Sequence, residues 1–255
     1  MFYNNINPTL FQLGPLEIRY YGIIYALSFI LAYFFVYHLA KKRNLNLTKD
    51  DVADFIFYLI IGTVIGARLF EIIFYEPAYY FANPLEMLAV WHGGLSFHGG
   101  LVGAVLAGYL YSKKKKVHFY DLADIVSMPL AFALFLGRIA NFINGELVGR
   151  LTTLPWCVKF MNYEGCRHPS QLYESLKNLV LFSILWSIKD KKLKKGIMFW
   201  SFVLLYSTLR FFIEFVKDPG DIGFILGLTM GQLLCIAMFA IGLFFFVKIN
   251  RQKHL

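Results

Sequence analysis

Seven stretches of predominantly apolar residues follow one another along the chain, separated by short polar segments. A helix needs about 20 apolar residues to cross the hydrocarbon core of a bilayer. The fifth stretch is short, and the fourth is interrupted by polar groups. The stretches cover residues 18–40, 52–74, 87–111, 120–143, 172–188, 196–216 and 224–248. This pattern predicts an all-α, polytopic transmembrane helix bundle of seven spans, formed by residues 1–255 as a single domain.

The basic residues between these stretches predict the orientation of the spans. Lysine and arginine are enriched in the loops on the cytoplasmic side of a membrane. Blocks of them follow the first, third, fifth and seventh stretches, within residues 41–49, 113–116, 189–195 and 248–253. The segment from Glu76 to Glu86 has none. Seven spans with the N-terminus outside and the C-terminus in the cytoplasm satisfy this distribution.

Composition supports a bilayer as the solvent of this chain. Hydrophobic residues make up 58% of it and charged residues 16%, against about 45–50% and 25% in ordinary soluble domains. The formal net charge of +9 resides largely in short blocks between apolar stretches, as in membrane proteins. We therefore expect the lipid bilayer as a partner and no nucleic acid.

The longest polar segment, residues 145–170, is predicted to form a small ordered cap outside the membrane. It contains Cys157 and Cys166, which could form a disulfide if the segment faces an oxidising compartment. Two unpaired thiols explain the sequence equally well. No cysteine or histidine spacing typical of a metal site is present.

Three arginines fall inside or near the ends of the apolar stretches: Arg68, Arg138 and Arg210. A charge at the centre of a transmembrane helix costs about 2.5–3.5 kcal/mol, so these side chains should face the protein interior and pair with carboxylates. Arg210 and Glu214 are spaced i,i+4 and are predicted to form a pair along one helix face. The available carboxylates are Glu71, Asp124, Glu146 and Glu214.

Polar residues also cluster after Arg138, where Asn141 follows at i+3 and Asn144, Glu146 and Arg150 come soon after. The segment is too polar to face lipid, and the predicted orientation places it at the outer end of the fourth span. A structural ion pair between two helices would explain any one of these charges. Several of them at one depth favour a binding site.

The segment Trp91–Gly103 is rich in glycine, which weakens a helix by about 1 kcal/mol per residue relative to alanine. The glycines permit close helix contact, through Gly99 and Gly103, or a broken helix that lines a cavity. His98 lies in this segment and is a candidate functional residue. For His92, a hydrogen-bonded interior histidine is the more common role.

Several segments carry a further signal: Arg19–Gly22, His92–Gly100, Gly137–Glu146 with Gly149–Arg150, His168–Glu174 and Tyr206–Glu214. Together they resemble the prolipoprotein diacylglyceryl transferase family. The block Gly-Arg-x-x-Asn-Phe-x-Asn-x-Glu is the most specific, with Ala140 where many members carry glycine. The segments occur in the family order and span nearly the whole chain.

The resemblance implies a multi-pass enzyme of the bacterial inner membrane that carries out the first step of lipoprotein maturation. The donor would be phosphatidylglycerol, and the acceptor would be the lipobox cysteine in the signal peptide of a preprolipoprotein. The products would be a thioether-linked diacylglyceryl group and glycerol 1-phosphate. No cofactor or metal is expected, because phosphate is already a good leaving group.

Under this resemblance, Arg138 and Arg210 are expected to bind the phosphate, since guanidinium is planar, bidentate and always charged. Such cations stabilise the negative charge that develops on the leaving group. Glu214 would orient Arg210. A polar wall that contacts the headgroup would consist of Asn141, Asn144 and Glu146.

A base is expected to take the proton of the acceptor thiol, whose ordinary pKa is about 8.5. His98 is the candidate, because an unperturbed imidazole titrates near 6.5; another residue or water stays open as the base. Tyr21 would position His98 or the donor lipid. The family match also places Tyr206 in the site.

Two other classes of function compete with a transferase. A transporter or channel would also use intramembrane arginines and a helix broken by glycine. However, no second half of the chain echoes His92–Gly103 or Gly137–Arg150, as paired halves of transporters often do. A non-catalytic assembly factor would not need histidine, arginine and glutamate gathered at one depth. The sequence therefore favours the transferase.

Overall fold

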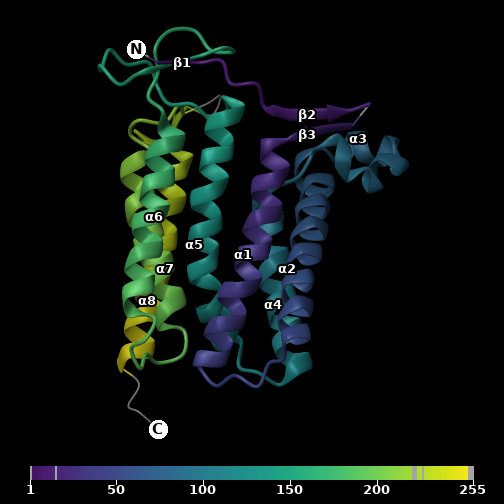
Figure 1. Ribbon diagram of the computed structural model, residues 1–255, viewed down its shortest axis with the longest axis vertical. Helices are drawn as coiled ribbons and strands as arrows, with labels where there is room; N and C mark the ends of the chain where they lie inside the picture. The colour runs from purple at the N-terminus through teal and green to yellow at the C-terminus, as the bar shows by residue number, and fades with distance from the viewer. Residues whose placement is uncertain (1, 15, 220–222, 226, 252–255) are drawn as a thin grey trace. The chain divides into compact units, whose positions relative to one another are not determined.

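The computed structural model describes residues 2–14, 16–219, 223–225 and 227–251, and most of them are helical (Figure 1). Within these residues, four helices are long and apolar enough to cross a membrane, namely Tyr20–Lys42, Lys49–Tyr75, Phe119–Asn144 and Met230–Arg251. A shorter apolar helix covers Ile197–Ile213. Leu226, in the predicted seventh span, and Lys253, in the last basic block, lie outside the described residues.

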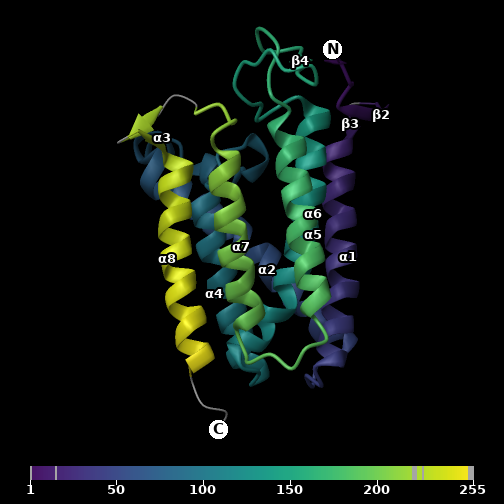
Figure 2. The same ribbon diagram turned by 90° about the vertical axis from the view of Figure 1, so that its left-hand side faces the viewer.

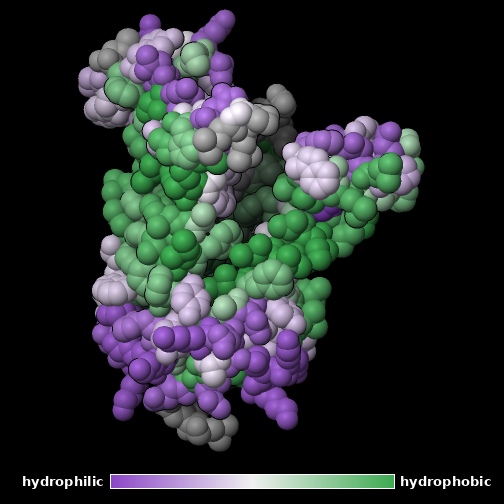
Figure 3. All heavy atoms as spheres, turned by 45° about the vertical axis from the view of Figure 1, so that its right-hand side comes forward, coloured by the Kyte–Doolittle hydropathy of each residue, from purple (hydrophilic) through white to green (hydrophobic). Residues whose placement is uncertain are grey.

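Large apolar side chains are exposed along the helices, among them Phe57, Leu106 and Phe244. Figure 3 shows hydrophobic residues, in green, over much of the helical surface in that view. Exposed apolar area on this scale is unfavourable in water and favourable in lipid. The helices therefore have the surface of a membrane protein.

The chain divides into two compact units, Met1–Phe35 with Asp124–Leu255 and Val36–Ala123. In the first unit, α6 packs against α7 and α7 against α8 (Figure 2). Three two-stranded sheets accompany these helices: β1 with β4 in parallel, and the antiparallel pairs β2–β3 and β5–β6. Two helices, α1 Tyr20–Lys42 and α5 Phe119–Asn144, belong mostly to this unit, and their residues 36–42 and 119–123 belong to the second. The other elements are β1 Phe2–Asn4, β2 Thr9–Leu13, β3 Leu16–Arg19, β4 Val158–Phe160, α6 Ser170–Ile188, α7 Ile197–Ile213, β5 Phe224–Ile225, β6 Leu228–Thr229 and α8 Met230–Arg251.

Helix α7 begins at a buried carboxylate of α5, which accepts hydrogen bonds from the first backbone N–H groups of α7. The backbone N–H groups of Gly196 and Phe199 donate to the two carboxylate oxygens of Asp124 at 2.9 and 2.8 Å. The first amides of a helix have no partner within the helix, and the helix dipole favours a negative charge there. Asp124 therefore fixes the start of α7 against α5.

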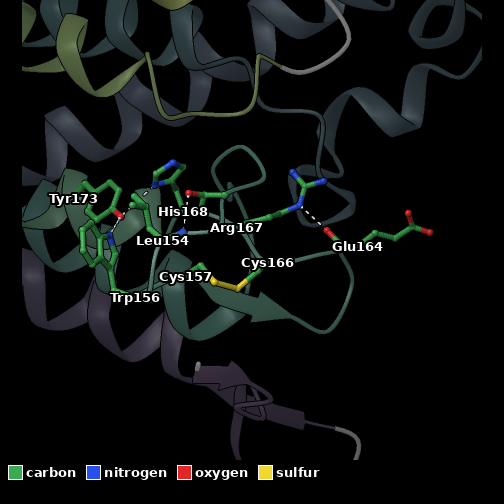
Figure 4. The surroundings of a disulfide bond; sticks show 9 residues. Leu154, Trp156, Cys157, Glu164, Cys166, Arg167, His168 and Tyr173 are labelled. Atoms are coloured by element: carbon green, nitrogen blue, oxygen red, sulfur yellow. Dashed lines mark hydrogen bonds between the residues drawn. A yellow bond between two sulfur atoms is a disulfide. The ribbon is translucent and has the colours of Figure 1, made fainter.

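The polar segment 145–170 is ordered, as predicted, and it is built on β4. The parallel pairing of β1 with β4 brings β1 to this segment, and Asn4 Nδ2 also donates to the carbonyl oxygen of Phe142, near the end of α5, at 2.6 Å. Phe142 packs on Val148, Val158 and Phe160. A disulfide joins Cys157 to Cys166 (Figure 4), which settles the alternative that the sequence left open.

In the second unit, the predicted span 87–111 differs from the structure at its start. Helix α4 begins only at Phe97, because Gly93 and Gly94 have φ of +89° and +66°, which a helix cannot contain. Ser96 then caps α4, since its Oγ accepts from the N–H of Gly99 at 3.3 Å. The elements of this unit are α2 Lys49–Phe70, η1 Glu71–Tyr75, α3 Pro77–Ala82, η2 Pro84–Leu88, η3 Val90–His92 and α4 Phe97–Lys115.

Close packing of α2 on α4 through glycine confirms one of the two roles predicted for Gly99 and Gly103. A Cβ atom added at Gly99 would clash with the carbonyl oxygen of Gly66, and one at Gly103 with that of Gly62. The two backbones therefore approach as closely as in small-xxx-small contacts between transmembrane helices.

Gly103→Ala is expected to destabilise the protein by about 1–3 kcal/mol, because the added methyl group overpacks a contact between two backbones. The measurement is thermal unfolding in detergent. Gly22→Ala is the control, since a Cβ atom there meets nothing within 4 Å. Equal unfolding temperatures for the two variants would show that the α2–α4 contact is looser than described.

Arg68 binds carbonyl oxygens in place of the carboxylate predicted for it. Its side chain is buried on α2 and donates to the carbonyl oxygens of Glu86, Met87, Ala89, Gly93 and Gly94 and to the hydroxyl of Tyr80. Five N–H groups on one planar cation suit several acceptors at once. Arg68 thus organises the irregular segment between α3 and α4.

Candidate active site

One buried carboxylate connects the two arginines to which the sequence assigned phosphate binding. Glu174 on α6 is 1% exposed. Nε of Arg138, on α5, lies 2.9 Å from its Oε2, and Nη1 of Arg210, on α7, donates to its Oε1. Three helices of the first unit therefore bring their charged side chains to one point.

Two further ion pairs extend this arrangement. Lys217, just after α7, places Nζ 3.1 Å from Oε1 of Glu174. Burial lowers the pKa of Lys217, and the carboxylate of Glu174 opposes that effect. Nη2 of Arg210 pairs with Glu214, as the i,i+4 spacing predicted. Thr229 also donates to Glu214, at 3.1 Å.

The polar residues after Arg138 form a chain of hydrogen bonds that begins at this arginine. Nη1 of Arg138 donates to Oδ1 of Asn141 at 3.3 Å, and Nδ2 of Asn141 donates to Oε1 of Glu146 at 2.7 Å. Gln171 on α6 donates to the carbonyl oxygen of Glu146 at 2.6 Å. Oδ1 of Asn144 is buried and has no hydrogen-bond donor among the described residues.

Lys177 and Tyr206 lie next to these ion pairs. Nζ of Lys177 is 3.9 Å from the centroid of the Tyr206 ring. Arg138, Glu174 and Arg210 are close enough to act electrostatically on both side chains. We call the charged residues at this point the Glu174 cluster; they are Arg138, Glu174, Lys177, Arg210, Glu214 and Lys217.

The two other predicted site residues lie outside the Glu174 cluster. Tyr21, on α1 in the first unit, donates to the hydroxyl of Tyr25 at 2.9 Å and is close enough to Arg138 to interact with it electrostatically. His98 is exposed on α4 in the second unit, and its Nδ1 lies 3.1 Å from the hydroxyl of Tyr75. His92 pairs with Glu86 at 2.8 Å.

The cluster carries more positive than negative charge. It has four cations and two carboxylates, and Glu146 adds a third carboxylate through Asn141. Formally ionised, these seven groups leave one positive charge. Buried cations without matching carboxylates are unfavourable unless another anion compensates them. The arrangement is therefore suited to a singly charged anion.

Three residues of the cluster carried no predicted role: Glu174, Lys177 and Lys217. Glu174 ends the segment His168–Glu174, which contributed to the family resemblance, so a signal for it was present. Lys177 follows at i+3 from Glu174, in the polar first half of a helix whose second half is mostly apolar. A lysine in such a position is itself a sign of function.

Exposed apolar helices and a buried cluster of ion pairs define an integral membrane protein with a charged site inside its helices. The model of the prolipoprotein diacylglyceryl transferase family matches residues 8–248. The chain belongs to this family.

Relatives match over almost their full length, and all three described here are named phosphatidylglycerol–prolipoprotein diacylglyceryl transferase. The relative from Geobacter sulfurreducens is 48% identical, over 99% of this chain and 99% of its own. That from Rickettsia rickettsii is 43% identical, over 98% and 99%. That from Bordetella avium is 41% identical, over 97% and 96%.

Proposed function

We propose that this protein transfers the sn-1,2-diacylglyceryl group of phosphatidylglycerol to the lipobox cysteine of a preprolipoprotein. Family membership supports the reaction. The meeting of Arg138 and Arg210 at Glu174 carries the assignment of the site, because a phosphodiester has the single negative charge that the cluster lacks.

In the proposed reaction, the thiolate sulfur attacks the glycerol carbon of the donor that bears the phosphate ester. A carbon–sulfur bond forms, the carbon–oxygen bond breaks, and glycerol 1-phosphate leaves with the electron pair. The thiol proton passes to a base. Arg138 and Arg210 stabilise the leaving phosphate, whose charge grows as the bond breaks.

The carboxylates have positioning roles in this proposal. Glu174 holds both guanidinium groups, and Glu214 fixes the second edge of Arg210. Asn141 and Glu146 extend from Arg138 and form the polar wall that contacts the headgroup, together with Asn144 and its buried amide oxygen. Tyr206 closes the site beside Lys177.

The topology is part of the proposal. Seven spans of one domain, N-terminus outside and C-terminus cytoplasmic, in the bacterial inner membrane, agree with the basic blocks of the sequence. The helices α4, α6 and α7 would then join the four longer ones as spans. The disulfide between Cys157 and Cys166 fits an oxidising compartment for segment 145–170.

His98 is the proposed base, supported by the family resemblance and by the chemistry of imidazole. His98→Gln is expected to lower transfer at pH 7 by about 100-fold, within the usual contribution of a general base. The loss should shrink as the pH approaches 8.5, because the thiol then ionises by itself. Transfer rates between pH 6 and 9 measure this, with exposed His38→Gln as the control. Full activity of His98→Gln at pH 7 would assign the base elsewhere.

The proposed function is tested with purified protein in detergent, phosphatidylglycerol and a fluorescent peptide that contains a lipobox cysteine. We expect a shift of the peptide on a gel, dependent on phosphatidylglycerol and lost when serine replaces the cysteine. An unmodified peptide, together with anion flux in sealed vesicles, would instead identify a transporter.

A further inference from the structure

Lys177 is a buried cation for which the described residues offer no hydrogen-bond acceptor. It lies on α6, i+3 from Glu174, and is 5% exposed. Its Nζ is buried without a hydrogen-bond partner in the described part of the chain. An ammonium group has three N–H donors, and taking such a group out of water is unfavourable unless its donors are paired. The buried ammonium group of Lys177 is therefore unfavourable unless a further group accepts its hydrogen bonds.

The carboxylates near Lys177 form ion pairs with other cations, although Oε2 of Glu174, beside Nε of Arg138, accepts no hydrogen bond within the described residues. Glu174 receives Arg138, Arg210 and Lys217, and Glu214 receives Arg210 and Thr229. Glu174 acts on Lys177 electrostatically, without a hydrogen bond to it. Lys177 is thus the cation in the cluster that does not form an ion pair of its own.

The face of Tyr206 holds the ammonium group at 3.9 Å from the ring centroid. A cation over an aromatic ring is attracted by the ring quadrupole, and this contact fixes where Nζ lies. The ring is not a hydrogen-bond acceptor of ordinary strength, so N–H groups that point away from it stay available. Tyr206 therefore keeps Lys177 beside the arginines with donors still free.

We propose that Lys177 is a further phosphate-binding residue, whose ammonium group donates to a non-bridging oxygen of the phosphate held by Arg138 and Arg210. The inference rests on the proposed function and adds a third donor to it. Arginine recognises phosphate through its planar fork and lysine as a compact point charge. Lys177 would stay with the phosphate from phosphatidylglycerol to the released glycerol 1-phosphate, and it forms no covalent bond.

The alternative is that Lys177 only packs against Tyr206, and Lys189 provides the matched control for it. Lys189 lies just after α6, with Nζ 4.2 Å from the centroid of the Trp186 ring, and it pairs with Asp190 at 3.1 Å. Lys189 therefore has the same kind of contact with an aromatic ring but lies outside the Glu174 cluster. Replacing each lysine by methionine keeps an unbranched side chain that is one atom shorter and removes the charge.

The experiment measures binding of glycerol 1-phosphate, and separately of inorganic phosphate, through the rise in unfolding temperature of the detergent-solubilised protein. Transfer to the lipobox peptide is measured in parallel. For Lys177→Met, we expect the dissociation constant of glycerol 1-phosphate to rise about tenfold or more, the effect of losing one hydrogen bond to a charged group. Lys177→Arg should retain most of the binding, and Lys189→Met should match the wild type.

Equal affinity of wild type and Lys177→Met for glycerol 1-phosphate would overturn the inference, whatever happens to transfer. A wild-type protein that binds the anion but modifies no peptide would instead refute the proposed function, and the comparison of affinities would still decide the role of Lys177. If the methionine variant does not fold, Lys177→Gln carries the same comparison.

Discussion

Arg138→Lys is expected to leave the protein folded in the membrane while lowering diacylglyceryl transfer by about 100-fold or more. Removing one fixed donor to developing negative charge typically lowers kcat by about 10²–10³. Lysine keeps the charge but cannot bind Glu174 through Nε and reach Asn141 through Nη1, as Arg138 does. Initial rates at saturating peptide and varied phosphatidylglycerol measure the effect.

Arg251→Lys is the control for this variant, because Arg251 is exposed at the end of α8. Its rates should equal those of the wild type. Near-normal lipidation by Arg138→Lys, with correct folding shown by an unchanged unfolding temperature, would remove Arg138 from the phosphate role.

Glu174→Gln is expected to destabilise the protein by about 3 kcal/mol or more, since breaking a buried ion pair leaves an uncompensated charge behind. Here three cations lose a carboxylate that they share: Arg138, Arg210 and Lys217. The change keeps the shape of the side chain, so packing stays nearly the same. Denaturant or thermal unfolding in detergent measures the loss, and transfer should fall with it.

Glu164→Gln in the exposed part of segment 145–170 is the control and should unfold as the wild type does. A second substitution tests whether uncompensated positive charge causes the loss of stability. Adding Lys217→Met to Glu174→Gln removes one of the uncompensated cations and should recover part of the stability. A double variant less stable than Glu174→Gln alone would mean that the cluster is not limited by excess positive charge.

Local sequence pattern predicted most of the long helices and the ion pair at the C-terminal end of α7. The apolar runs predicted helices at the positions of α1, α2, α5, α6, α7 and α8, and the i,i+4 spacing predicted Arg210 with Glu214. The start of α4 at Phe97 was beyond the apolar pattern, because it depends on two glycines with positive φ. The hydrophobicity of the sequence does not indicate which residues adopt a positive φ.

Partners that come from distant parts of the chain were not predictable from spacing. Glu174 meets Arg138 and Arg210 only because α6 packs against α7 and meets α5 at this point. Arg68 was expected to pair with a carboxylate, but carbonyl oxygens between α3 and α4 surround it. Every residue has a carbonyl oxygen, so no sequence pattern distinguishes those that will be free to accept.

The proposed reaction depends above all on Arg138 and Arg210 holding the phosphate of the donor lipid. An experimental structure with phosphatidylglycerol bound tests it most directly. We expect phosphate oxygens about 3 Å from the guanidinium nitrogens of both arginines, with Glu174 still bound to them. A phosphate held at another place in the protein, with both guanidinium groups bound only to carboxylates, would contradict it.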